Sequence, residues 1–168
     1  EIEPNVSARE AVWVPQAGIV DFGAVANKYA EIFESRGGEI GLGQKVVAVK
    51  EHKDRLTVES ITAMGKEQVW ETSYFVNCAG LYSDQIALLT GENSGMQILP
   101  FRGEYYELKV ESEHLVRNLI YPLPNPNFPF LGVHFTRMIQ GGIEAGPNAV
   151  LAFKREGYSR WQVDFKEL

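Results

Sequence analysis

The chain has 168 residues, of which 45% are hydrophobic, and its formal net charge is −6. This length suits one ordinary domain, and the hydrophobic share excludes disorder as the default. The acidic balance argues against nucleic-acid binding, no apolar run reaches the roughly 20 residues of a membrane helix, and the single Cys78 excludes an internal disulfide.

The first half of the chain predicts one clear helix. Between residues 21 and 36 apolar residues recur at helical spacing, and polar residues occupy the opposite face. Asp21 is the expected N-cap, and Gly37-Gly38 is the expected stop.

Short strands joined by hairpin turns are expected after this helix. Residues 83–92 then predict a short helix, with Ser83 or Asp84 as its cap. The strand-like runs lie at residues 45–52, 54–63, 66–72 and 73–80.

From residue 98 onward the pattern changes to longer strands interrupted by proline. Residues 97–110 and 128–139 are candidate strands, and the proline-rich stretch 121–129 between them predicts an ordered loop. Gly141-Gly142 suits a tight turn, and Gly146-Pro147-Asn148 suits a second turn before a further strand. We therefore expect a helix with a β-meander, followed by an antiparallel layer.

Two arginine-bearing stretches could carry chemistry. In "PFRGEYYEL" a strand would place Arg102, Glu104 and Tyr106 on one face. Arg102 then either forms a salt bridge with Glu104 at a solvent-exposed sheet edge or faces a cavity that holds an anionic ligand. In "FPFLGVHFTR", His134 and Arg137 fall on opposite faces unless a bulge intervenes.

The stretch "YFVNCAGLYSD" is a third candidate, because an apolar strand runs through small residues into a helix. Such a turn exposes backbone N–H groups to a phosphate or a flavin edge, although the glycine could equally serve only the turn. We expect Cys78 to be a small buried residue.

Several signatures of binding sites do not occur in the sequence. There is no G-x-G-x-x-G motif and no P-loop. The stretch "GLGQKV" leads into a strand and not into a helix, so it does not qualify as a dinucleotide fingerprint. The three histidines are scattered, so we expect no metal site.

The order of the motifs "GIVDF", "RGGEI", "VNCAGLYSD", "PFRGEYY", "LIYPLPNPNFPFLGVHFTR" and "GPNAVLAFKREGY" closely resembles that of L-2-hydroxyglutarate oxidases and dehydrogenases. These are FAD-dependent oxidoreductases of the D-amino-acid-oxidase type. The resemblance implies an α/β (α+β) fold, with helices and the β-meander from a Rossmann-like FAD lobe in residues 1–97. It also implies an antiparallel substrate-binding sheet, lying over the flavin, in residues 98–168.

The resemblance implies hydride transfer from C2 of a 2-hydroxy dicarboxylate to flavin N5, giving 2-oxoglutarate. Proteins of this family begin with a glycine fingerprint that this chain lacks, and this chain has no initiator methionine. We therefore expect an internal piece of a longer protein that binds FAD weakly and is inactive alone.

The resemblance also suggests roles for particular residues. Val46 or Val47 would contact the adenine end through the main chain, and Cys78, Ala79 and Gly80 would line a second turn against FAD. Arg102, Tyr106 and Arg137 would bind the substrate carboxylates. From its residue type, His134 is a candidate base for the hydroxyl proton.

Other functions remain open at this stage. An FAD-dependent amine or glycerol-phosphate oxidase of the same family is the nearest alternative, and an independent non-catalytic binding module is the alternative from another class. We expect a cytoplasmic location, with peripheral membrane attachment open for the longer protein, and self-association of a severed piece.

Overall fold

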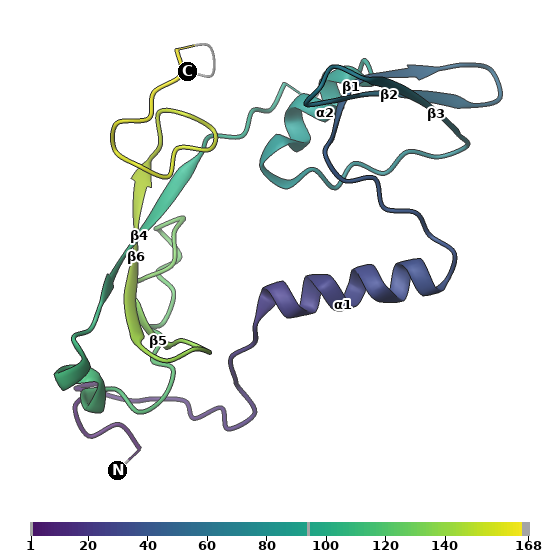
Figure 1. The fold of residues 1–168 in the computed structure, drawn as a ribbon. Coiled ribbons are helices and arrows are strands. Elements are labelled where there is room, and N and C mark those ends of the chain that lie inside the picture. The colour runs from purple at the N-terminus through teal and green to yellow at the C-terminus, as the bar shows by residue number, and fades with distance from the viewer. Residues whose placement is uncertain (1, 94, 166–168) are drawn as a thin grey trace. The chain divides into compact units, whose positions relative to one another are not determined.

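A computed structural model describes residues 2–93 and 95–165 of the chain. It divides into two compact units, which are described separately. Residues 1–31 and 101–168 form the unit called here the β4–β6 unit, and residues 32–100 form the meander unit. The elements, labelled in Figure 1, are α1 (Phe22–Ser35), β1 (Gln44–Glu51), β2 (Leu56–Thr62), β3 (Glu67–Thr72), the 3-10 helix η1 (Gly80–Tyr82), α2 (Ser83–Leu89), β4 (Phe101–Glu107), the 3-10 helix η2 (Val110–Leu115), β5 (His134–Arg137) and β6 (Ile143–Leu151).

Helix α1 confirms the expected helix and its cap. The Asp21 Oδ1 atom accepts hydrogen bonds from the backbone N–H groups of Gly23 (2.8 Å) and Ala24 (3.2 Å). These contacts satisfy two of the N–H groups that have no partner within the helix. Gly37, at φ +85°, follows the helix in the left-handed conformation that ends it.

The meander unit contains the expected meander, with strand order β1-β2-β3 and antiparallel pairing throughout. Val49 and Val58 face each other across β1 and β2 and are buried. Ser60 is also buried, and its hydroxyl accepts a hydrogen bond from Trp70 Nε1 and donates one to Gln44 Oε1, both at 3.1 Å. One polar group in this sheet is thus fully satisfied by its cross-strand neighbours.

The expected fourth strand of this half, residues 73–80, is wrong. The chain there lies outside every strand of the described residues, and Gly80 already belongs to η1. An extended segment becomes a strand only when another strand supplies its hydrogen bonds. The sequence pattern of residues 73–80 alone therefore could not determine whether they form a strand.

The expected cap of the following helix is also wrong. The N-cap of α2 is Tyr82, and no side chain caps it. The Ser83 hydroxyl instead donates to the carbonyl of Gly80 at 2.6 Å. The Asp84 carboxylate accepts from the N–H groups of Gln85 (2.8 Å) and Ile98 (3.0 Å), so it anchors a later loop.

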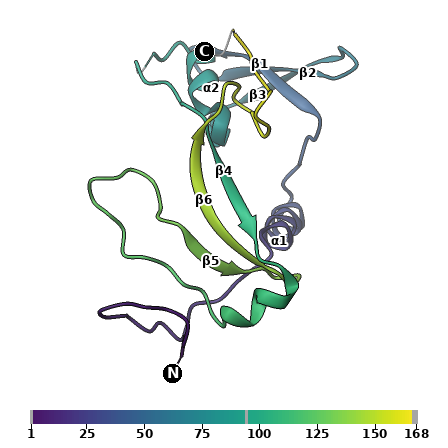
Figure 2. The ribbon, with the colours of Figure 1, turned by 90° about the vertical axis from the view of Figure 1, so that its left-hand side faces the viewer.

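The β4–β6 unit is built on an antiparallel sheet of order β4-β6-β5, which confirms the antiparallel layer. Strands β4 and β6 run side by side as a long curved ribbon, with β5 along one part of β6 (Figure 2). Ile143 at the start of β6 is fully buried. The candidate strand 128–139 is shorter than expected, because only His134–Arg137 pair within the sheet.

The second turn expected at Gly146-Pro147-Asn148 is wrong, because these residues lie inside β6. The register shifts there, so that Tyr105 of β4 faces both Gly146 and Pro147. Proline is tolerated within a strand at such a bulge. The turn expected at Gly141-Gly142 is confirmed, with φ values of +97° and +86°.

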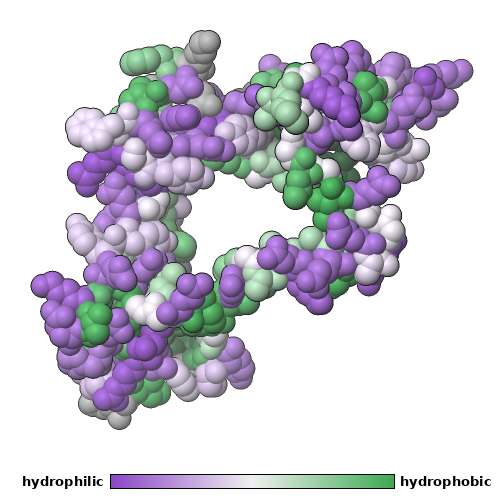
Figure 3. Space-filling view, viewed as in Figure 1, coloured by the Kyte–Doolittle hydropathy of each residue, from purple (hydrophilic) through white to green (hydrophobic). Residues whose placement is uncertain are grey.

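The described residues therefore have a mixed α+β fold with two three-stranded antiparallel sheets. Many hydrophobic side chains lie at the surface (Figure 3). Among the described helices, none combines the length and the apolar character that crossing a membrane requires.

Candidate functional site

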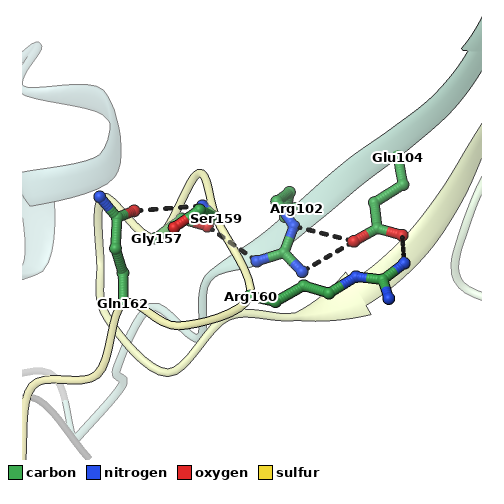
Figure 4. A network of polar contacts seen from close by, with 6 residues as sticks. All are labelled: Arg102, Glu104, Gly157, Ser159, Arg160 and Gln162. Atoms are coloured by element: carbon green, nitrogen blue, oxygen red, sulfur yellow. Dashed lines mark hydrogen bonds and ion pairs between the residues drawn. The ribbon is translucent and has the colours of Figure 1, made fainter.

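Arg102 of β4 lies in a network of polar contacts (Figure 4). Its Nε and Nη2 atoms donate to Glu104 Oε1, at 3.2 and 2.8 Å, and its Nη1 atom donates to the carbonyl of Gly157 at 3.1 Å. The Arg102 side chain is 12% exposed. Of the two alternatives left open by the sequence, the pair with Glu104 is the one present, and it also holds the chain near Gly157 against β4.

A second arginine reaches the same carboxylate from the C-terminal segment. Arg160 Nη2 lies 3.6 Å from Glu104 Oε2, on a side chain that is 77% exposed. The hydrogen bond from Arg102 lowers the pKa of Glu104, burial acts in the opposite direction, and the charge of Arg160 adds to the lowering. Sequence reasoning missed Arg160, because nothing local relates it to a strand more than 50 residues away.

Tyr106 lies two residues beyond Glu104 in β4, and the register with β6 shifts between these two residues. Its side chain is 73% exposed, and it is not part of the network around Arg102.

His134 of β5 is buried, and three of its neighbours define its setting. Its Nδ1 atom lies 3.0 Å from the carbonyl oxygen of Gly132. Its ring stacks on Tyr121, with centroids 4.3 Å apart and planes inclined by 15°. The Tyr121 hydroxyl lies 3.4 Å from Thr136 Oγ1. The side chains of His134, Tyr121 and Thr136 therefore share one face.

Arg137 lies on the opposite face of β5, where its Nη1 atom donates to the carbonyl of Val116 at 2.7 Å. The pairing of β5 with β6 is continuous from His134 to Arg137, so no bulge turns Arg137 toward His134.

Val46 and Val47 differ in their setting within β1. The register with β2 shifts between Val46 and Ala48, which places Val47 outside the regular ladder. Val46 is half-buried and Val47 is exposed. A bulge of this kind releases main-chain groups from the sheet, and these groups are what a ligand contact through the backbone needs.

Cys78, Ala79 and Gly80 lie in the turn that precedes α2. Gly80 has φ +54°, and a Cβ atom built there would meet nothing within 4 Å. Cys78 is exposed, contrary to the expectation of a buried thiol. The turn thus presents an open, small-residue surface to which another molecule can come close.

Asn77 shapes this turn, and sequence reasoning missed it. Its Oδ1 atom accepts from the N–H of Ala79 at 3.2 Å, and its Nδ2 atom donates to the carbonyl of Ser83 at 2.8 Å. The signal was available, because an asparagine side chain often bonds the backbone two residues further along in a turn.

Glu3 was also missed. Its carboxylate accepts hydrogen bonds from the N–H of Arg117 at 3.2 Å, from the N–H of Asn118 at 2.5 Å and from Asn118 Nδ2 at 2.7 Å. Asn5 Nδ2 adds a bond to the carbonyl of Leu115 at 3.0 Å. The beginning of the chain is thus fastened to the segment that leads to Tyr121.

Within residues 2–93 and 95–165, no group of three or more His, Cys, Asp or Glu side chains is placed to hold a metal ion.

Comparison with known proteins gives consistent matches over the whole chain. The DAO family, described as FAD dependent oxidoreductase, matches residues 1–167. The L-2-hydroxyglutarate dehydrogenase of Indibacter alkaliphilus is 54% identical over 167 residues, covering 99% of this chain and 41% of that protein. The L-2-hydroxyglutarate dehydrogenase of Escherichia coli K12 is 45% identical over 167 residues, and the mitochondrial one of Caenorhabditis elegans is 45% identical over 171 residues.

The matches to the E. coli and C. elegans proteins cover 99% and 100% of this chain, and 39% of each relative. The chain therefore spans about 40% of the length of the curated relatives it matches. A family match over nearly all residues identifies the chain as a member of the FAD dependent oxidoreductase family.

Proposed function

We propose that this chain is part of an FAD-dependent dehydrogenase that oxidises L-2-hydroxyglutarate to 2-oxoglutarate. The observation that carries the proposal is the 54% identity, over 99% of the chain, to a protein named L-2-hydroxyglutarate dehydrogenase. This identity over nearly the whole chain supports the proposal more directly than a shared fold would, because a fold alone does not imply a function.

The meander unit would contribute to binding FAD. Val46 and Val47 would offer main-chain groups at the β1 bulge, and Cys78, Ala79 and Gly80 would offer an open turn. The extended residues 73–79 have exposed apolar side chains, including Tyr74 and Val76, and no ladder partner among the described residues. A Rossmann-like sheet completed by further strands would use such a segment, which supports a FAD-binding role for the meander unit. The FAD lobe proposed for residues 1–97 also includes residues 1–31, which the structure groups with the β4–β6 unit.

The β4–β6 unit would bind the substrate, as proposed for residues 98–168. A dicarboxylate is best held by cations, and guanidinium groups match carboxylates in geometry. Arg137 uses one nitrogen for Val116, so its remaining N–H groups could meet one carboxylate. Arg102 would have to exchange Glu104 for a substrate carboxylate, and the exposed Tyr106 could add a hydroxyl.

His134 would accept the proton of the substrate hydroxyl, since a neutral imidazole is a base suited to neutral pH. Bound FAD would supply the acceptor for the hydride that leaves C2 of the substrate. The 168 residues have no glycine fingerprint for the pyrophosphate, so we expect them to bind FAD weakly and to be inactive alone.

The test compares this chain with an extended protein, meaning a polypeptide of the relatives' length that contains it. FAD is titrated into each, and flavin absorbance is then followed without oxygen after addition of L-2-hydroxyglutarate. We expect no saturable binding by the chain, and binding followed by bleaching in the extended protein. D-2-hydroxyglutarate serves as the matched control, since it differs only in configuration at C2.

Each other outcome contradicts a defined part of the proposal. Tight FAD binding by the 168 residues would show that the fingerprint is dispensable. Bleaching by sarcosine or glycerol 3-phosphate, and not by L-2-hydroxyglutarate, would transfer the assignment to an amine or glycerol-phosphate oxidase. An extended protein that does not bind FAD would support a non-catalytic binding module.

A further inference from the structure

The hydrogen bond at Nδ1 fixes the tautomer of the neutral His134 ring. A backbone carbonyl oxygen can only accept a hydrogen bond, so the Nδ1 atom, 3.0 Å from the Gly132 oxygen, must carry the proton. In the neutral ring the lone pair therefore resides on Nε2. No hydrogen bond joins Nε2 to another of the described residues, so its lone pair is not engaged by them.

Tyr121 holds the face of this ring. The backbones of Ile120 and Phe135 exchange two hydrogen bonds, of 3.0 and 2.9 Å, in an isolated bridge. That bridge places Tyr121 directly opposite His134, and the two rings stack at 4.3 Å. The stack restricts rotation of the imidazole plane and covers one of its faces.

Thr136 lies on the same face, two residues beyond His134, and its Oγ1 atom is 3.4 Å from the Tyr121 hydroxyl. This face therefore combines one imidazole nitrogen of defined protonation with two hydroxyl groups. Such a set can bind a hydroxyl group and, in addition, remove its proton.

We propose that Tyr121 is a positioning residue that orients His134, so that Nε2 is the atom that takes the hydroxyl proton of the 2-hydroxy acid. The inference rests on the proposed function and adds to it the atom and the residue that aims it. Nε2 gains the hydroxyl proton, the O–H electron pair becomes the second bond of the new carbonyl, and the C2 hydrogen leaves with its two electrons for the flavin.

The experiment uses the extended protein with Tyr121→Leu, which removes the stacking ring, and Tyr121→Phe, which keeps it. Tyr158→Leu is the matched control, because Tyr158 is exposed and makes no ring contact among the described residues. The flavin reduction rate is measured at saturating L-2-hydroxyglutarate. We expect at least about a tenfold loss in Tyr121→Leu, because catalysis depends steeply on the placement of the base. Tyr158→Leu should keep the rate. Tyr121→Phe, which keeps the stacked ring and loses only the hydroxyl, should lose less of the rate than Tyr121→Leu.

Nitrogen NMR of protein labelled in histidine gives a readout that a merely structural role would not move. The His134 signals are identified by their loss in His134→Asn. We expect one Nδ1-protonated tautomer in the unsubstituted protein and in Tyr121→Phe, and a mixture in Tyr121→Leu. Tyr121→Met provides a second test if the leucine variant does not retain FAD.

The outcomes separate the two proposals. An unchanged rate or an unchanged single tautomer in both Tyr121→Leu and Tyr121→Met would overturn the positioning role. An unchanged rate in His134→Asn would overturn His134 as the base and, with it, the role of Tyr121. Failure of L-2-hydroxyglutarate to bleach the flavin in the unsubstituted protein would overturn the proposed function, while the tautomer measurement would still report on the Tyr121–His134 pair.

Discussion

Arg102 and Glu104 show how one side-chain pair can serve structure and still bear on binding. The Arg102 guanidinium uses three nitrogens, two on Glu104 and one on the Gly157 carbonyl. A planar guanidinium has this forked geometry, and a lysine ammonium does not. Any carboxylate ligand at Arg102 must therefore compete with a carboxylate that the chain supplies itself.

The lowered pKa of Glu104 gives a prediction for Glu104→Gln. Because the pKa of Glu104 lies below its ordinary value in the folded chain, the Arg102–Glu104 ion pair stabilises the folded state at neutral pH. This contribution is lost as the pH falls through the lowered pKa. The variant should therefore unfold more easily than the unsubstituted chain near neutral pH, and the difference should vanish in acid.

The measurement is the free energy of unfolding of both proteins in urea, from neutral pH to about pH 3. Glu107→Gln is the matched control, because Glu107 lies on the same strand and is exposed. If the difference in unfolding free energy between Glu104→Gln and the unsubstituted chain persisted unchanged at acid pH, the charge of Glu104 would not be what stabilises the folded chain.

At this scale the sequence predicted contacts that strand alternation determines, and it failed for contacts made by loops. Arg102 and Glu104 are two residues apart on one strand, so their pairing was one of two open alternatives. Tyr121 meets His134 only because a single bridge brings a proline-rich loop beside β5. No local pattern encodes such a bridge.

Among the elements, β6 shows a close approach between strands that depends on glycine. A Cβ atom at Gly146 would lie 2.6 Å from Tyr105 Cδ1 and 3.0 Å from the Glu104 carbonyl oxygen. Gly146 is buried. The ring of Tyr105 fills the space that a side chain at position 146 would need. This contact lies at the register shift between β4 and β6, where the sequence predicts a turn.

Gly146→Ala should therefore destabilise the β4–β6 unit by about 1–3 kcal/mol, the usual cost of overpacking. Denaturant unfolding measures the change. Gly18→Ala is the matched control, since a Cβ atom there would meet nothing within 4 Å. Adding Tyr105→Ala should recover part of the loss, and strict additivity of the two changes would contradict the steric explanation.

Elements with local signals were predicted well from the sequence. Helix α1 has a capping aspartate, periodic apolar residues and a glycine stop, and the three meander strands have alternating patterns with polar turns. The strand predicted at residues 73–80 is wrong, because a segment becomes a strand only when a partner strand supplies its hydrogen bonds. The sequence predicts a turn at Pro147, whereas this residue lies within β6, because the register shift that accommodates it arises only from the pairing with β4.

For the chain as a whole, the notable property is how few apolar side chains are buried. Among the described residues, the buried hydrophobic ones are Val49, Val58, Val116, Ile143 and Ala152. Some large apolar side chains are almost fully exposed, such as Leu123 at 93% and Trp161 at 91%. Monomeric soluble proteins seldom leave extensive apolar surface in water.

We therefore predict that the chain of 168 residues self-associates. Sedimentation velocity at increasing protein concentration should show a growing share of species larger than the monomer. A dye that fluoresces on apolar surfaces should bind the chain more strongly, per residue, than it binds the extended protein. A chain that stays monomeric at every concentration and leaves the dye dark would contradict the prediction.

Asn77 has a consequence for the cost of ordering a binding surface. With its two hydrogen bonds and that of the Ser83 hydroxyl, the turn from Cys78 to Gly80 is shaped by contacts within the chain. The loss of conformational entropy in this turn is then part of folding, and a ligand that meets it does not bear that loss again. An asparagine that need not touch the ligand can in this way raise the ligand's affinity.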